Sequence, residues 1–345
     1  MRVAIVNDSA LATEALRRVV GADPRCAVAW TARDGAEAVR RCAEDRPDVV
    51  LMDLLMPVMN GAEATRQIMQ RSPCPVLVVT STVAGNFDLV CQALSHGAYD
   101  AVCTPVLGGA GPGRAGAELL AKLDRVGRVN RHLTGCDTTE TAPAARPSGQ
   151  VAGGPPPLPL VAIGASTGGP AALEAILTRW PATFPAAVVI AQHIAPDFAG
   201  SLADWLGRRA PLTVRLAAAG DRPKAGEVLI ANGADHLVLA PERAWAYCAE
   251  PRECPYQPSV DALFHSLAAH WPWPAVAVLL TGIGRDGAEG LLALRQKGWH
   301  TVAQDEATSV VYGMPQAANR IGAARSVLPL DQIGSHVAER LGRPV

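Results

Sequence analysis

The sequence lacks several features that would restrict its class. Its formal net charge is −1, and no cluster or stripe of basic residues stands out. Nucleic acid and anionic membranes are therefore poor candidates for direct partners, because both attract basic surfaces. No apolar stretch approaches the ~20 residues of a transmembrane helix, and the N-terminal apolar run is too short for a signal peptide. We expect a cytoplasmic protein with no direct membrane insertion.

Cysteine is present, but without the spacing of a metal site. The eight cysteines are scattered, with no Cys-x-x-Cys pair and no nearby paired histidines. This pattern is typical of reduced thiols in a cytosolic protein and disfavours a zinc site. With 345 residues, of which 49% are hydrophobic, the chain is long enough for two domains with cores of their own.

Strand and helix patterns alternate five times in the first part of the chain, which predicts an α/β fold with a doubly wound parallel sheet. Residues 134–158, rich in Thr, Ala, Pro and Gly, are typical of an extended linker. The alternation then resumes, which predicts a second doubly wound, mostly parallel sheet. In the first part, strands are predicted at 2–6, 26–32, 48–52, 76–80 and 100–103, and helices at 10–20, 36–44 and 117–129.

Polar side chains follow the strands of the first sheet where those strands end. Asp8 and Asp53 come after the first and third strands, and Thr80 ends the fourth. Because the carboxyl ends of parallel strands meet at one edge, we expect these residues to lie together. Two carboxylates there can hold Mg²⁺, and Asp53 can accept a phosphoryl group as an aspartyl phosphate. Taken singly, each aspartate could instead cap the helix that follows it.

The second half begins with a strand-turn-helix segment around Ser166. Residues 158–163 predict a buried strand, 164–169 a tight turn, and Pro170 the first turn of a helix. The turn reads Gly-x-Ser-x-Gly, the setting of a nucleophile elbow, because small neighbours permit a strained backbone and an exposed hydroxyl. It could equally cradle a phosphate or be purely structural. Against a nucleotide site, the turn lacks the ending of a P-loop, and no acidic residue after the next strand could hold a ribose.

His193 and Asp286 follow two further apolar strands, at 187–191 and 273–280. The doubly wound rule brings both to the same edge as Ser166, and the three residue types match a Ser-His-Asp relay. Their order along the chain is no objection, because the relay recurs on unrelated folds. Taken alone, His193 could be a hydrogen-bonded strand-end residue and Asp286 a turn residue. Asp305 is a rival acid that could instead cap a helix or face the substrate from the surface.

Backbone N–H groups at two places could bind an oxyanion. One is the glycine-rich loop around Ile283, and the other is the helix N-terminus behind Ser166, where Thr167 lies. Elsewhere in this half, Asn232-Gly233 predicts a hairpin between strands 228–231 and 237–240. Further elements are predicted as helices at 171–180, 288–296 and 331–341 and a strand at 301–304.

The N-terminal motifs resemble a response-regulator receiver domain over residues 1 to about 128. The resemblance depends on the acidic edge, on Thr80 and on the run Asp53-x-x-Met56-Pro57-x-x-Asn60-Gly61. Two positions depart from the family pattern. Receivers usually have two adjacent acids after the first strand, where this chain has Asn7-Asp8, and a Lys-Pro after the fifth, where it has Thr104-Pro105. Both departures change the charge around Asp53.

The C-terminal motifs resemble the chemotaxis protein-glutamate methylesterase (CheB) family. They are Gly164-Ala-Ser-Thr-Gly-Gly-Pro170, Gln192-His193, Thr281-Gly-Ile-Gly-Arg-Asp-Gly-Ala-Glu-Gly290 and Gln304-Asp-Glu-Ala-Thr-Ser-Val-Val-Tyr-Gly-Met-Pro315. The receiver departures, with Leu54-Leu55-Met56-Pro57-Val58-Met59, look most similar to the branch that serves Wsp-type surface-sensing pathways.

This resemblance implies hydrolysis of glutamate γ-methyl esters on the cytoplasmic helices of chemoreceptors, with release of methanol, and deamidation of receptor glutamines. It makes Ser166 the nucleophile, His193 the general base, Asp286 its orienter and Asp53 the phosphorylation site. No catalytic cofactor is implied, whereas Mg²⁺ belongs at the receiver's acidic site. In the family the unphosphorylated receiver partly blocks the active site, and a CheA-type histidine kinase relieves the block.

The expected organisation is a receiver domain at 1–128, a linker at 129–157 and a methylesterase domain at 158–345. The alternative is a two-domain signalling switch whose second domain binds a nucleotide or a partner without hydrolysis. Receptor demethylation that depends on Ser166 would favour the esterase, and tight nucleotide binding without methanol release would favour the switch.

Overall fold

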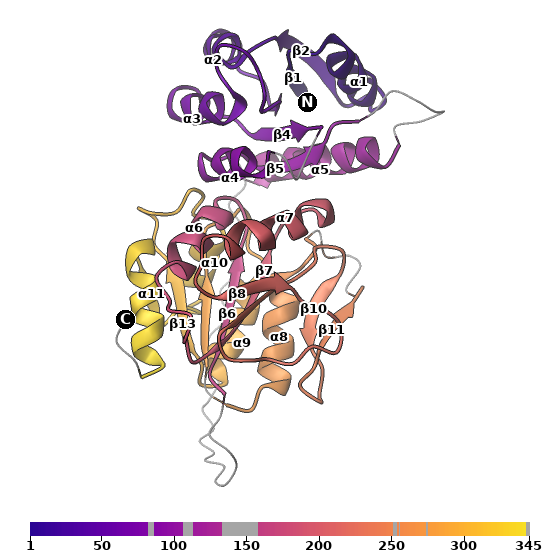
Figure 1. The fold of residues 1–345 in the computed structure, drawn as a ribbon. Helices are drawn as coiled ribbons and strands as arrows, with labels where there is room; N and C mark the ends of the chain where they lie inside the picture. Colours follow the sequence, from indigo (N-terminus) through magenta and orange to yellow (C-terminus); the bar gives the residue numbers. More distant parts are fainter. Residues whose placement is uncertain are drawn as a thin grey trace.

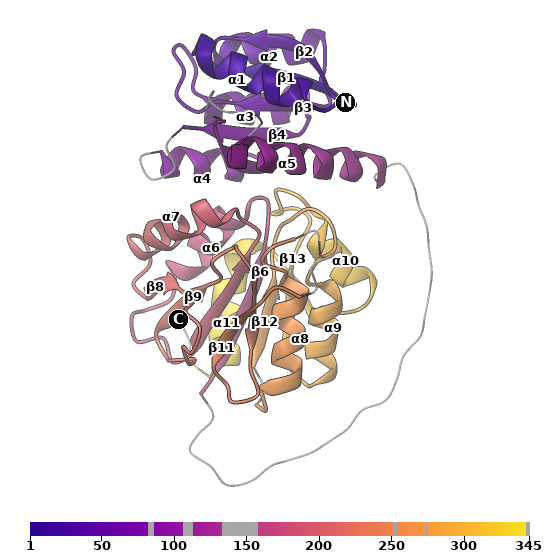
Figure 2. The same cartoon turned by 90° about the vertical axis from the view of Figure 1, so that its right-hand side faces the viewer.

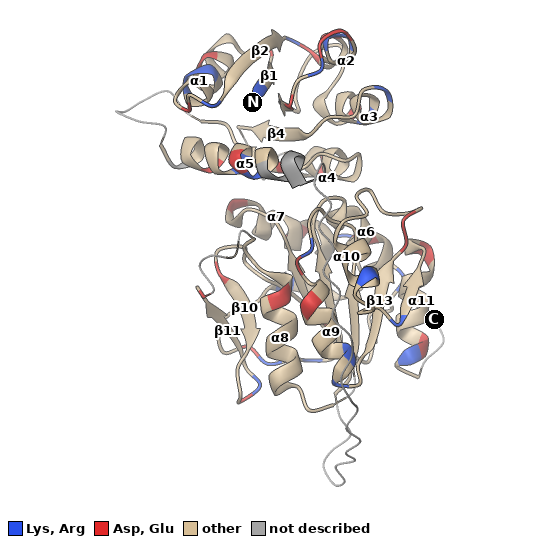
Figure 3. Cartoon of the chain, turned by 180° about the vertical axis from the view of Figure 1, so that it is seen from behind, with Lys and Arg blue, Asp and Glu red and all other residues tan. Residues whose placement is uncertain are grey.

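The computed structural model describes residues 1–81, 86–105, 113–132, 158–250, 254, 256–273 and 275–342. They form two α/β domains, one above the other in Figure 1, each built around its own parallel sheet. Acidic and basic residues are interspersed over both domains (Figure 3). All cysteines in these ranges are free thiols. None of the described helices is long and apolar enough to cross a membrane.

The N-terminal domain is a parallel sheet in the order β2-β1-β3-β4-β5, which confirms the predicted doubly wound fold. Each of its first three helices begins at an N-cap residue whose side chain accepts a hydrogen bond from a backbone N–H in the first turn. These residues are Ser9, Asp34 and Asn60. The strands are β1 (Arg2–Val6), β2 (Ala27–Ala32), β3 (Val49–Met52), β4 (Val76–Thr80) and β5 (Asp100–Cys103). The helices are α1 (Ala10–Gly21), α2 (Gly35–Glu44), α3 (Gly61–Arg71), α4 (Phe87–Ser95) and α5 (Gly113–His132).

Helix α5 is longer at both ends than the predicted helix at 117–129. The description of the chain stops at residue 132 and resumes at 158, so most of the predicted linker at 129–157 lies outside the described residues.

The C-terminal domain is a larger parallel sheet in the order β14-β13-β12-β6-β7-β9-β8. Apolar side chains of α6, α7 and α11 form a core on one face, and those of α8, α9 and α10 form a core on the other. This arrangement confirms the second predicted doubly wound sheet. The main-sheet strands are β6 (Leu160–Ala165), β7 (Ala187–Gln192), β8 (Thr213–Leu216), β9 (Glu227–Ile230), β12 (Val276–Leu279), β13 (His300–Gln304) and β14 (Ser326–Leu328). The helices are α6 (Gly169–Leu177), α7 (Pro196–Gly207), α8 (Val260–His270), α9 (Ala288–Gln296), α10 (Met314–Arg320) and α11 (Leu330–Arg340).

The predicted hairpin around Asn232-Gly233 is wrong. Strand β9 pairs in parallel with β7 and β8, while β10 (His236–Leu239) pairs antiparallel with β11 (Trp245–Cys248) in a separate small sheet. The run 228–231 is fully buried, as suits an interior strand of a parallel sheet. At Gly233 a Cβ would come within 2.7 Å of the Ile194 carbonyl oxygen, so the turn packs against the chain after β7.

The two domains are in contact through α4 and the loop between α4 and β5. Helix α4 of the N-terminal domain lies against α6 and α7 of the second domain (Figure 2). The Phe87 and Trp205 rings meet edge to face at 6.5 Å. The Asp88 carboxylate accepts hydrogen bonds from Trp205 Nε1 at 2.5 Å and from Arg209 at 2.8 Å. The N-terminal domain therefore sits on the carboxyl-end edge of the second sheet.

Two glycines of the second domain give a matched test of how closely β6 packs against α8. A Cβ at Gly164 on β6 would lie 2.2 Å from Val260 Cγ1, whereas a Cβ at Gly200 on α7 would meet nothing within 4 Å. Gly164→Ala should lower stability by ~1–3 kcal/mol through overpacking. Gly200→Ala should raise it by ~0.5–1 kcal/mol, because it reduces the entropy of the unfolded chain. Denaturant unfolding measures both, and equal stabilities would contradict the close approach of β6 and α8.

Candidate active site

The three residues predicted for the relay follow neighbouring strands. Strands β12, β6 and β7 are adjacent and parallel at the centre of the second sheet, and Ser166, His193 and Asp286 come after their carboxyl ends. The side chains therefore reach one edge of the sheet, as the doubly wound rule requires.

The turn after β6 is held tightly by its neighbours. The Ser166 N–H donates to the Thr281 carbonyl at 3.0 Å, and the Gly169 N–H donates to the Ser166 carbonyl at 2.8 Å. Gly168 has a φ of 80°, and a Cβ at Gly169 would lie 2.0 Å from Gln192 Oε1. Small residues are therefore required around Ser166. Because Gly169 donates within the turn and the Gln192 side chain packs against it, the turn is poorly suited to cradle a phosphate.

The buried side chain of Gln192 joins the turn that carries Ser166 to the segment that carries His193. Its Nε2 donates to the Ser166 carbonyl at 2.8 Å and to the His193 carbonyl at 3.0 Å. On the other side, the Thr281 hydroxyl donates to the Thr167 carbonyl at 2.9 Å, and Gln304 Oε1 accepts from the Thr281 N–H at 2.9 Å. These buried amide and hydroxyl groups fix the spacing of the strand ends.

His193 and Asp286 form a buried pair. His193 Nε2 lies 2.7 Å from Asp286 Oδ2, and their side chains are only 10% and 4% exposed. An ionised carboxylate can only accept, so Nε2 carries the proton of this bond. The other ring nitrogen, Nδ1, is buried and has no hydrogen-bond partner. Tyr256 stacks on the ring, with centroids 4.5 Å apart and planes 6° from parallel.

The Asp286 carboxylate is fully hydrogen-bonded. Besides His193, it accepts from the Val260 N–H at 2.7 Å, the Ser259 hydroxyl at 2.9 Å and the Asp261 N–H at 3.1 Å. Burial raises the pKa of Asp286, but the bonds from His193 and from the backbone of α8 outweigh burial and lower the pKa below its ordinary value. Asp286 is therefore the anion of the pair at neutral pH.

Asp305, the rival acid, has a local role instead. Its Oδ1 accepts from the Thr308 N–H at 3.0 Å and from the Thr308 hydroxyl at 2.6 Å. It thus closes the turn after β13, while Asp286 contacts the histidine.

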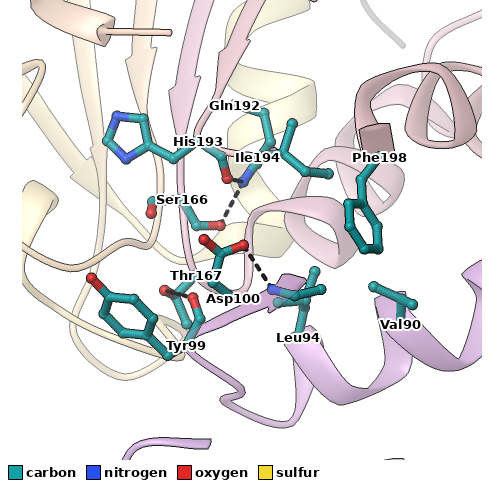
Figure 4. Close-up of a pocket in the computed structure, with 11 residues that line it drawn as sticks. Val90, Leu94, Tyr99, Asp100, Ser166, Thr167, Gln192, His193, Ile194 and Phe198 are labelled. Carbon is teal, nitrogen blue, oxygen red and sulfur yellow. Dashed lines mark hydrogen bonds between the residues drawn. The ribbon is translucent and has the colours of Figure 1, made fainter. Parts of the chain in front are cut away.

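Ser166 shares a pocket with His193, and Figure 4 shows their side chains beside one another. Within the described residues, the backbone N–H groups of Thr167 and Ile283 donate to no protein acceptor, so both remain available to an oxyanion. The structure thus brings the three predicted side chains together and leaves Nδ1 of His193 without a partner.

Residues of the receiver form one wall of this pocket. Figure 4 shows Tyr99 and Asp100 of the receiver beside Ser166 and Thr167, with Val90 and Leu94 of α4 nearby. The Thr167 hydroxyl donates to the Tyr99 carbonyl at 3.1 Å. The space left beside Ser166 is about 10 Å³, roughly that of one water molecule. The receiver therefore covers the pocket in this conformation.

The receiver's own acidic site lies at the carboxyl ends of its strands. Burial, together with the negative charge of Asp8, raises the pKa of Asp53 to about 6. Asn7 is buried, and its Oδ1 accepts from the Ser9 N–H at 2.8 Å. Thr80 ends β4, and its carbonyl accepts from the Thr104 N–H at 2.9 Å. Asp8 and Asp53 repel one another without a bound cation, so the pair fits a divalent metal ion.

Lys122 does not replace the lysine that receivers carry after the fifth strand. Its Nζ lies 2.8 Å from Asp100 and donates to the Ala101 carbonyl at 2.5 Å, at the beginning of β5. Thr104 follows the other end of that strand. Thr104, and not a lysine, therefore follows β5, as the sequence indicates.

Sequence reasoning missed several residues that shape the site. Ser259 carries a helix-start signal, since Ser precedes a helical pattern, but nothing in the sequence indicates that α8 begins at Asp286. Tyr256 and Tyr99 carry no signal at all, because they reach His193 and Ser166 through loops and through the docking of the domains.

Comparisons with known proteins identify the family of each domain. The family model described as CheB methylesterase matches residues 161–337, and that of the response regulator receiver domain matches residues 3–107. The chain is 51% identical over 344 residues to "Protein-glutamate methylesterase/protein-glutamine glutaminase 1" of Bordetella avium, covering 100% of this chain and 98% of the relative. It is 50% identical over 347 residues to "Protein-glutamate methylesterase/protein-glutamine glutaminase 4" of Burkholderia thailandensis, covering 99% and 98%.

Among solved structures, the catalytic domain of the Thermotoga maritima CheB methylesterase is similar at a TM-score of 0.51 and 36% identity. The match covers 53% of this chain and 98% of that structure.

Asp53→Asn should raise the melting temperature at about pH 7.5 and change it little at about pH 4. The folded-state pKa of Asp53 is about 6, above the ordinary value, so the stability of the fold decreases as the pH rises through about 6 and the buried group ionises. At pH 4 the group is protonated in the folded protein and does not destabilise it. Mg²⁺ should stabilise the unchanged protein at the higher pH and not the variant. Thermal unfolding measures both, and equal melting temperatures for the two proteins at both pH values would contradict the raised pKa.

Proposed function

Since the chain belongs to the CheB methylesterase family, we propose that Ser166, His193 and Asp286 hydrolyse glutamate γ-methyl esters on a chemoreceptor. The protein is a carboxylic ester hydrolase, a protein-glutamate methylesterase regulated through its receiver domain. The observation that supports these residue roles best is the 2.7 Å contact between His193 and a buried, fully hydrogen-bonded Asp286, in the loop beside Ser166.

In the proposed mechanism the Ser166 hydroxyl oxygen attacks the ester carbonyl carbon while Nδ1 of His193 takes the hydroxyl proton. Asp286 holds Nε2–H and stabilises the imidazolium that forms. The N–H groups of Thr167 and Ile283 receive the oxyanion. When the tetrahedral intermediate collapses, the carbon–methoxy oxygen bond breaks, His193 returns its proton, and methanol leaves. Water attacks the acyl-enzyme by the same route, which releases glutamate and restores Ser166.

The same attack on a glutamine side chain would release ammonia instead of methanol. We therefore propose deamidation as a second activity of the same residues. No step of either reaction requires a catalytic cofactor.

Regulation follows from the position of the receiver. The receiver domain implies a histidine kinase as the phosphoryl donor. We propose that this kinase is of the CheA type and that Asp53 accepts the phosphoryl group. Mg²⁺ held by Asp8 and Asp53 would neutralise the incoming charge. Thr80, at the end of β4, would respond to the phosphoryl group. Helix α4 and the segment at Tyr99 would then move away from the pocket.

The proposed substrate sites lie on cytoplasmic helices, so we propose a cytoplasmic location. Service to a Wsp-type pathway, and the exact domain limits at 128 and 158, stay predictions.

Ser166→Ala should abolish methanol release from methylated receptor, by on the order of 10⁴-fold or more, because the nucleophile is lost. Ser201→Ala, on α7 and outside the pocket, is the control and should keep full activity. Circular dichroism should show both variants folded. Full activity in the Ser166 variant would remove the nucleophile assignment.

Asp88→Ala should raise the activity of the unphosphorylated protein several-fold and leave the phosphorylated activity unchanged. The substitution removes the bonds from Trp205 and Arg209 that hold α4 on the second domain. Asp45→Ala, which breaks an exposed pair with Arg2 far from this contact, serves as control. Methanol release with and without a small-molecule phosphodonor is the measurement. Unchanged basal activity would show that this contact does not restrain the enzyme.

A further inference from the structure

The Asp286 carboxylate lies at the N-terminus of α8, and its two oxygens are used differently. Oδ2 takes His193 Nε2 and the Val260 N–H, each at 2.7 Å. Oδ1 takes the Ser259 hydroxyl at 2.9 Å and the Asp261 N–H at 3.1 Å. A carboxylate with donors on both oxygens cannot turn about its Cβ–Cγ bond without breaking several bonds. The orientation of the plane that faces His193 is thereby fixed.

The Ser259 hydroxyl has only one arrangement open to it. Its oxygen accepts the Ala262 N–H at 3.2 Å, as the N-cap of α8. Its single proton must point to Asp286 Oδ1, because an ionised carboxylate has no proton to give. The Ser259 N–H donates to His236 Nδ1 at 2.9 Å, and both residues are buried. The backbone of Ser259 is therefore fixed by its bond to His236, while its hydroxyl is fixed by Ala262 and Asp286.

A nearby like charge makes these donors more important. The carboxyl group of Asp261 lies close to that of Asp286. Burial, together with the charge of Asp286, raises the pKa of Asp261 to about 6. The Asp261 carboxylate is tied to the Gly290 N–H at 2.7 Å. Without the Ser259 hydroxyl, Oδ1 of Asp286 would keep only its longest bond, beside a group that repels it.

We propose that Ser259 is a positioning residue of the esterase, whose hydroxyl fixes the Asp286 carboxylate and through it the His193 ring. The proposal rests on the function proposed above. With the carboxylate fixed, Nε2–H of His193 points to Oδ2 and Nδ1 stays free for the Ser166 proton. Ser259 touches neither substrate nor the reacting atoms, and it acts only through Asp286.

The test separates this role from the capping of α8. Ser259→Gly and Ser259→Ala both remove the hydroxyl, but glycine is tolerated at an N-cap much better than alanine. If Ser259 positions Asp286, kcat for methanol release should fall by ~10–100-fold, and equally in both variants, because a small misplacement of catalytic groups has that effect. KM should not change. The melting temperature should fall more in the alanine variant, and the glycine variant keeps the test valid if alanine prevents folding.

The control is Ser266→Ala on the same helix. Ser266 also joins two backbone groups, accepting from the Leu239 N–H at 2.9 Å and donating to the Leu263 carbonyl at 2.7 Å, but it does not contact Asp286. Its loss should lower the melting temperature and leave kcat unchanged. Values of kcat that follow the melting temperature across all three variants would overturn the proposal.

A second readout needs no substrate. The proton between His193 Nε2 and Asp286 should give a low-field NMR resonance in the unchanged protein and in Ser266→Ala, and should be weakened or lost in Ser259→Gly. An unaltered resonance in Ser259→Gly, with unaltered kcat, refutes the role of Ser259 alone. Failure of the unchanged protein to release methanol refutes the esterase function, and the resonance then still reports whether Ser259 holds the pair together.

Discussion

A buried, ionised Asp286 is the constraint on which the rest of the site depends. An isolated carboxylate in an interior would be strongly destabilising, so the chain must surround it with donors or leave it protonated. The N-terminus of α8 supplies two backbone N–H groups and a serine hydroxyl, and His193 supplies the fourth donor. The need to pair this carboxylate therefore constrains three features together. They are the position of α8, the turn before α9 and the direction of the histidine ring.

Ser166 is held by a different set of contacts. Buried amides and hydroxyls, chiefly Gln192, Thr281 and Gln304, bind the turn after β6 to its neighbours through main-chain groups. Because buried polar groups are costly when unpaired, each bond in this network limits the movement of the strand ends. The Ser166 backbone is thus rigid, while its hydroxyl makes no structural bond to the histidine.

The receiver uses the same edge of the sheet. Its carbonyl at Tyr99 accepts the Thr167 hydroxyl, next to one of the two N–H groups proposed for the oxyanion. Its helix α4 packs against α6 and α7, where its buried apolar side chains join those of the second domain in one cluster. Polar and aromatic contacts to α7 add to this apolar packing. The contacts that hold His193 and Asp286 together lie within the second domain, so they do not depend on the N-terminal domain.

Much of the fold and of the candidate site could be derived from the sequence. The contacts of Ser259 and Asp88, on which two of the predictions depend, could not. Apolar periodicity and strand-end polar residues determined both doubly wound sheets and placed Ser166, His193 and Asp286 at one edge, because parallel strands of one sheet share a direction. The hairpin at Asn232-Gly233 was wrong, because turn residues describe a bend and not the partners of the flanking strands. Only the tertiary structure decided that α8 begins at Asp286, that Tyr256 stacks on His193 and that Tyr99 reaches Thr167. Those contacts join segments distant along the chain, and no local pattern of residues determines which distant groups will meet.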